Sequence, residues 1–144
     1  LSAVDVSALR ELDPSVRDGF RIVYDRECPF EMRVQEGEDG PGEVGTLEAV
    51  RVRVLTAGDG EEVESIRVEL MSESDLFFSY SHSVREEEYA AIQEEQRLMV
   101  PFQDYAGVLS RSLNSVITHP HTHLAVLVMH RDGHARLDFI ENME

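Results

Sequence analysis

The densest group of side chains that could bind a metal is His119, His121 and His123, with His130 and His134 farther along the chain. Imidazole is a common ligand of zinc and nickel. In an extended segment the first three would share one face, but side chains two residues apart on a strand are separated by about 7 Å. One strand alone therefore cannot supply three ligands at about 2 Å from an ion. We interpret these histidines as the polar entry to a strand and expect no metal.

Paired carboxylates are the second candidate, because two converging acidic groups can act as acid and base in hydrolysis. Acidic residues cluster at positions 61–62, 86–88 and 94–95. The last two clusters lie on a predicted surface helix beside Arg85 and Arg97. Charges of both signs on one helix face are typical of a solvated surface, so we assign them no catalytic role.

Motifs for covalent catalysis and nucleotide binding are absent from the sequence. There is no Gly-x-Ser-x-Gly elbow, and Cys28 stands beside Pro29 without a base or oxyanion-hole motif nearby. Neither glycine-rich phosphate motif occurs, and residues 59–61 lack the remaining positions of a calcium loop. We therefore expect a protein that is not an enzyme and has no cofactor.

The composition sets limits on possible partners. The 144 residues suffice for one domain, and 13 basic against 29 acidic side chains give a formal charge of −16. Such a chain is repelled by phosphate backbones and anionic lipids, so we expect neither nucleic acid nor a membrane as a partner. A single cysteine excludes an internal disulfide and fits a reducing intracellular compartment.

The first half of the chain predicts short strands. We expect residues 1–19 to form an N-terminal arm or short helix, and residues 20–144 to form a head domain with its last hairpin unfinished. Residues 20–24 and 30–34 are rich in strand-forming side chains and predict two short strands, or one strand broken at Pro29. The acidic, glycine-rich segment 36–45 predicts a mobile loop.

Further strands follow from alternating hydrophobicity. Residues 50–54 and 66–70 alternate apolar and polar on either side of a glycine-containing turn, which predicts an antiparallel hairpin. The aromatic segment 75–80 predicts a fifth strand. Near the end, residues 121–130 and 135–140 predict a hairpin with a tight turn at Asp132-Gly133.

Two helices are predicted between these strands. Ser83 and Glu86 have the spacing of a capping box and predict a helix over residues 84–96. Pro101 suits the first turn of a second helix, whose apolar stripe is Phe102, Tyr105, Ala106, Leu109, Leu113 and Val116. We expect Phe78 and Leu109 to join the sheet to the helices.

This order of elements predicts an α+β domain, with an antiparallel β-sandwich or flattened barrel closed by an inserted helix pair. Aromatic and apolar side chains gather where the two helices meet. A helix pair over a sheet often leaves a groove between the layers, and without catalytic motifs such a groove favours protein contacts.

The stretch from Ile66 to Val116 resembles the head domain of the centriolar cartwheel family, spindle assembly abnormal protein six. The resemblance rests on Asp75-Leu76-Phe77-Phe78-Ser79-Tyr80, Glu86-Glu87-Glu88-Tyr89 and Gln96-Arg97-Leu98-Met99-Val100-Pro101-Phe102. Two positions depart from the family pattern, since Leu76 replaces a proline and Ser79 replaces an apolar residue.

This resemblance implies a head similar to those of DNA-repair scaffold proteins, followed by a long parallel coiled coil that pairs two chains. It also implies that an apolar residue at the tip of a late hairpin enters a pocket on a neighbouring head and builds a ninefold ring. On this basis the pocket candidates are Leu98, Val100, Phe102, Tyr105 and Leu109, and the residues near the tip are Phe139, Ile140 and Met143. We expect the tip residue itself just beyond Glu144.

The function implied is a non-catalytic, self-associating scaffold of the centriole or basal body, in the cytoplasm and cytoskeleton. Its partners would be further copies of itself and other centriolar proteins. The alternative is a β-sandwich adaptor that binds unrelated peptides in the same apolar groove.

Overall fold

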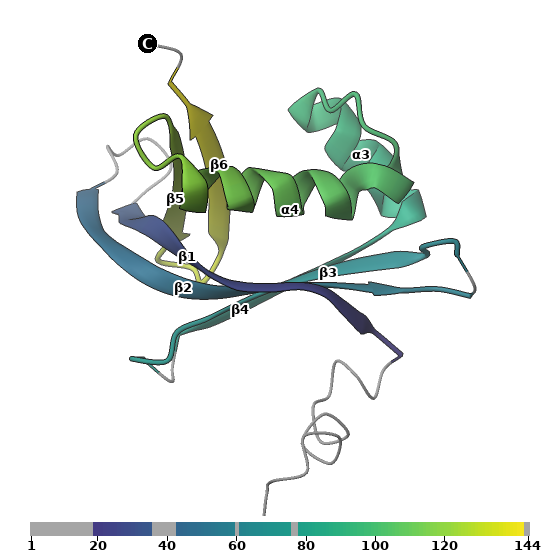
Figure 1. Ribbon diagram of the computed structural model, residues 1–144, viewed down its shortest axis with the longest axis horizontal. Helices are drawn as coiled ribbons and strands as arrows, with labels where there is room; N and C mark the ends of the chain where they lie inside the picture. The colour runs from purple at the N-terminus through teal and green to yellow at the C-terminus, as the bar shows by residue number, and fades with distance from the viewer. Residues whose placement is uncertain (1–18, 36–42, 60, 76–77, 143–144) are drawn as a thin grey trace, which may run out of the picture.

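The computed structural model describes residues 19–35, 43–59, 61–75 and 78–142 (Figure 1). The predicted N-terminal arm up to residue 18, most of the predicted loop 36–45, Leu76, Phe77 and Met143 lie outside these residues. Within the described part, no helix combines the length and the apolar character needed to cross a membrane.

Six strands form one mixed sheet in the order β4-β3-β2-β1-β5-β6. Neighbouring strands are antiparallel except β1 and β5, which run parallel. The strands are β1 (Arg21–Gln35), β2 (Glu43–Ala57), β3 (Ser65–Met71), β4 (Ser79–Arg85), β5 (His123–His130) and β6 (Ala135–Glu141).

The helices α3 (Glu86–Gln96) and α4 (Phe102–Thr118) lie between β4 and β5, as predicted. The sheet is strongly curved into a half-barrel, and α4 lies across its concave side (Figure 1). The α+β class is therefore confirmed. In place of the predicted antiparallel sandwich or flattened barrel, the strands form a half-barrel with one parallel pair, β1 and β5. Because β4 is an edge strand, the helix pair carries the chain back across the sheet to β1, and such a crossover permits parallel pairing.

The predicted break at Pro29 is also wrong, because β1 is one continuous strand. Pro29 pairs with Ala49 of β2. Pairing with β5 begins only at Phe30, so Pro29 lies where that side of β1 is still an open edge. A residue without an N–H group is tolerated at such an edge.

β4 begins and ends later than the sequence predicted. It continues through the polar residues Ser81, His82 and Ser83, which pair with β3. α3 therefore begins at Glu86, and its first turn is capped by Glu88, whose carboxylate accepts a 3.2 Å hydrogen bond from the Arg85 N–H. The predicted capping box at Ser83 is replaced by this one, two residues farther on.

Both predicted hairpins are confirmed. Val52 pairs with Leu70 and Val54 with Val68, so one face of β2 and β3 is apolar as the alternation requires. Four residues, 131–134, lie between β5 and β6, and the predicted two-residue turn Asp132-Gly133 is at their centre. Gly133 adopts φ +95°, a conformation that favours glycine.

The core fills the concave side of the sheet under α4. Its largest fully buried side chains include Phe30, Ile66, Leu113 and Leu127. Phe78 packs against this cluster as predicted. Leu109 is only half-buried and does not pack against it, so α4 contributes Phe102, Leu113 and Val116 instead.

Candidate functional site: a cavity between α4 and the β5–β6 hairpin

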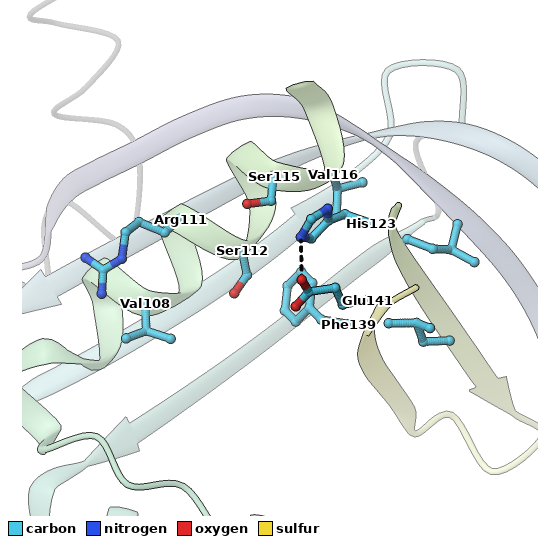
Figure 2. Close-up of a pocket in the computed structure, with 10 residues that line it drawn as sticks. Val108, Arg111, Ser112, Ser115, Val116, His123, Phe139 and Glu141 are labelled. Atoms are coloured by element: carbon cyan, nitrogen blue, oxygen red, sulfur yellow. Dashed lines mark ion pairs between the residues drawn. The ribbon is translucent and has the colours of Figure 1, made fainter. Parts of the chain in front are cut away.

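A cavity of about 270 Å³ opens between one side of α4 and the last hairpin (Figure 2). The α4 wall is made of Val108, Arg111, Ser112, Ser115 and Val116. The hairpin wall is made of His123, Leu124, Phe139, Ile140 and Glu141. The cavity therefore has a mixed lining, in which five apolar side chains alternate with serines and with charged or titratable groups.

The spacing of residues along α4 explains why the cavity has this helical wall. Leu113 and Val116 point to the sheet, and Val108, Ser112 and Ser115 lie on the neighbouring helix face. Serines at these positions are too small to fill the space up to β6. Phe139 and Ile140 are 37% and 45% exposed. Of the tip residues named from the sequence, these two contribute to the cavity.

His123 and Glu141 form the polar edge of the hairpin wall. They are cross-strand partners in β5 and β6, and His123 Nε2 lies 3.7 Å from Glu141 Oε1 (Figure 2). The Thr122 hydroxyl lies 2.9 Å from the other ring nitrogen of His123. The imidazole is thus held from both sides in the wall of the cavity.

The junction of α3 and α4 is a separate region, and it contains the five pocket candidates named from the sequence. The Tyr89 hydroxyl donates a 2.6 Å hydrogen bond to the Val100 carbonyl, and the Gln93 side-chain amide donates another of 3.2 Å. The Tyr89 ring packs 5.4 Å from Phe102 and 5.0 Å from Tyr105, centroid to centroid. Burial raises the pKa of Tyr89 and of Tyr105.

These contacts give Val100, Phe102 and Tyr105 a role in holding the two helices together. Phe102 is buried, whereas Leu98 and Leu109 are half-buried. None of the five lines the cavity between α4 and the hairpin. The structure thus gathers most of them around Tyr89, on a different part of α4.

The side chains that suggested chemistry are dispersed. His119 follows the end of α4, with its ring 6.0 Å from that of His123, and His121 is exposed in the following turn. Among the described residues, no three histidine, cysteine or acidic side chains are placed to hold a metal ion. Burial raises the pKa of the Cys28 thiol to about 12, so this sulfur is protonated at neutral pH.

The sequence did not indicate the helical wall of the cavity. This wall has no apolar stripe in the sequence, because it combines Val108 with Ser112 and Ser115. A serine on a helix is ordinarily expected to face solvent. One sequence feature could have indicated the hairpin wall. Phe139 and Ile140 are adjacent apolar residues on a strand, so they point to opposite faces of the sheet, whereas a strand with one buried face needs only one of them to be apolar.

The half-barrel and its cavity define an α+β domain with a recess between α4 and the last hairpin. Residues 22–144 match the family of the centriolar protein SAS N-terminal domain, and the chain belongs to this family. Membership implies a structural role at the centriole, in a family not known for enzymatic activity. No curated protein sequence matches the chain.

Solved structures with the same fold include SAS-6 proteins of two organisms. An N-terminal coiled-coil dimer of C. elegans SAS-6 superposes with a TM-score of 0.70 at 12% identity, covering 87% of this chain and 72% of that one. The N-terminal domain of Leishmania SAS-6 superposes with a TM-score of 0.63 at 17% identity, covering 86% of this chain and 94% of that one. An N-terminal fragment of Leishmania SAS-6 that contains parts of its coiled coil and is an F257E mutant superposes with a TM-score of 0.69 at 16% identity. The match covers 87% of this chain and 67% of that one.

Proposed function

We propose that this domain is the self-associating head of a cartwheel protein, and that the cavity between α4 and the β5–β6 hairpin receives an apolar side chain of a second copy. The observation that carries the proposal is the position of the cavity at the end of β6. Glu141 ends that strand and is itself a wall residue. The chain therefore leaves the sheet directly beside the cavity.

This proximity suits a twofold contact between heads. In a symmetric pair, each copy presents the same patch, so a donor and an acceptor lying side by side are used twice. The Asn142 N–H donates a 2.8 Å hydrogen bond to the Thr122 carbonyl and fixes the direction in which the chain leaves β6. The inserted residue would follow this point, beyond Glu144.

A contact of this kind is weak by itself. Burying one large apolar side chain contributes about 1.5–3 kcal/mol, far less than a stable dimer needs. If a coiled coil pairs the chains, ring closure makes further head contacts effectively intramolecular, and weak contacts then suffice. This reasoning supports a ninefold cartwheel assembled from coiled-coil dimers in the cytoskeleton, where other centriolar proteins are further proposed partners.

The helix junction with Leu98, Val100, Phe102, Tyr105 and Leu109 stays the pocket predicted from the sequence. Its disadvantage as a receiving site is that Phe102 is 6% exposed and packs against Tyr89. Val100 and Leu109 are the members that are half-buried without packing against the core cluster. One experiment can distinguish this surface from the cavity.

The experiment is amide NMR of a form of the protein that continues past Glu144, recorded over a range of concentrations. If heads associate through the cavity, the amide signals of Val108, Ser112 and Leu124 shift with concentration, and those of Leu98 and Met99 do not. Shifts at Leu98, Met99 and Tyr105 without shifts at Val108, Ser112 or the hairpin would assign the contact to the helix junction. Spectra independent of concentration up to the millimolar range would reject self-association and favour the adaptor.

A further inference from the structure

Arg111 makes no ion pair with any described residue, in contrast to five other arginines of the described structure. All 13 basic residues of the chain are arginine. Many of the described ones are engaged, as Arg33 is with Glu31, Arg51 with Asp25 and Arg136 with Asp138. Arg111 is exposed on α4, lines the cavity, and makes no hydrogen bond or ion pair with any described residue.

The position of this guanidinium matters because each domain carries a formal charge of −16. Two such domains repel each other when they approach. Arg111 lies on the α4 wall of the cavity, to one side of the pair of His123 and Glu141 on the hairpin wall (Figure 2). A cation at the place of contact can offset part of that repulsion if it meets a carboxylate of the incoming partner.

The end of β6 supplies a suitable carboxylate. Asp138 is already bonded to Arg136, with nitrogen–oxygen distances of 3.0 and 3.2 Å. Glu141 is held only loosely, 3.7 Å from an imidazole nitrogen, and its side chain is 58% exposed. It is also the acidic residue of the cavity wall. In a twofold contact through this cavity, the Glu141 of one copy approaches the α4 wall of the other.

We propose that Arg111 is a specificity residue for a second copy of this chain, binding the partner's Glu141 carboxylate while an apolar side chain fills the cavity. This inference rests on the proposed function. A guanidinium can bind both carboxylate oxygens at once, which fixes the orientation of the partner as well as its charge. With both the apolar insertion and the ion pair, the cavity would favour a partner segment that carries an apolar side chain next to a carboxylate. It would disfavour a partner segment that is basic.

Charge reversal tests the proposal by sedimentation equilibrium on the form that continues past Glu144. Arg111→Glu and Glu141→Arg each place like charges together twice in a symmetric dimer, so each should weaken association by at least about tenfold. The double variant Arg111→Glu/Glu141→Arg should restore association to within about threefold of wild type. Arg21→Glu is the matched control, since Arg21 is exposed at the start of β1, far along the chain from the cavity.

Each outcome decides a separate question. Weakening in both single variants with recovery in the double variant supports the ion pair. If the single variants associate like Arg21→Glu while Val108→Glu does not associate, the ion pair is refuted and the cavity contact stands. If single variants weaken association without recovery in the double variant, Glu141 is not the partner of Arg111. If the wild-type protein does not associate, the proposed function and this inference both fail.

Discussion

The Tyr89 hydroxyl on α3 donates a 2.6 Å hydrogen bond to the backbone carbonyl of Val100, which precedes α4. Tyr89 is 3% exposed, so this bond is shielded from water. It links two helices through residues eleven positions apart and sets the angle at which the chain enters α4. Since α4 forms one wall of the cavity, the bond also helps to position that wall.

Tyr89→Phe should therefore lower the free energy of unfolding by about 1 kcal/mol, because it removes one donor and leaves the Val100 carbonyl with Gln93 alone. Chemical denaturation measures this change. Tyr80→Phe is the matched control, since Tyr80 is more exposed and its hydroxyl makes no hydrogen bond to a described residue. Equal stability of Tyr89→Phe and wild type would show that the bond contributes nothing.

Leu113→Ala should destabilise the domain by about 2–5 kcal/mol, because Leu113 is 1% exposed and its removal leaves a cavity in the core. Leu109→Ala, four residues earlier on the same helix, should cost clearly less, since Leu109 is half-buried. Urea midpoints of the two variants give the comparison. If Leu109→Ala were the more damaging change, the orientation of α4 described above would be wrong.

Asp25 should contribute stability that depends on pH. A hydrogen bond from Arg51 is the main cause that lowers the Asp25 pKa below its ordinary value of 3.8, and the charges of Arg51 and Arg53 add to it. A depressed carboxyl pKa stabilises the fold above the ordinary value, and that stability is lost as the pH falls through the folded-state pKa. Asp25→Asn should thus cost about 1 kcal/mol at pH 7 and progressively less below about pH 4.

Thermal or urea unfolding at several pH values tests this prediction against Glu94→Gln, which changes an exposed carboxylate of α3. A difference between Asp25→Asn and wild type that stays constant from pH 7 into the acid range would argue against the ion pair as its source.

Cys28 should be unreactive toward thiol reagents in the folded protein. Its side chain is fully buried, its sulfur lies 3.9 Å from the Leu113 carbonyl oxygen, and its pKa is raised to about 12. Labelling with an aromatic disulfide reagent should be slow in buffer and fast in denaturant, because only the thiolate reacts. Comparable rates in both conditions would place Cys28 at the surface.

The sequence predicted elements whose periodicity is strong and local. The alternation around Val52 and Val54 gave the central hairpin, and the stripe from Phe102 to Val116 gave α4. The break predicted at Pro29 was wrong because the effect of a proline depends on which side of β1 is paired, and this is a tertiary property. The parallel pairing of β1 with β5 likewise depends on where the helix crossover ends.

The cavity was harder to predict than the fold. Its helical wall includes Ser112 and Ser115, whose contribution is the space that these small side chains leave. The predicted pocket residues were chosen for apolar character, and Phe102 uses that character to pack against Tyr89 in the core. Composition identifies what is apolar, but only the arrangement of elements shows which apolar groups remain accessible.

The most direct test of the central claim is sedimentation equilibrium of the protein in a form that continues past Glu144, comparing wild type with Val108→Glu. Val108 is half-buried in the cavity wall, and Met99→Glu is the matched control because Met99 is 93% exposed outside the cavity. Circular dichroism must first show that each variant is folded. We predict reversible association of wild type and Met99→Glu, micromolar or weaker. We predict monomers for Val108→Glu, because the added carboxylate would lie where the apolar side chain of the partner is proposed to insert. A wild-type protein that stays monomeric at millimolar concentration, or a Val108→Glu variant that associates as wild type does, would contradict the account.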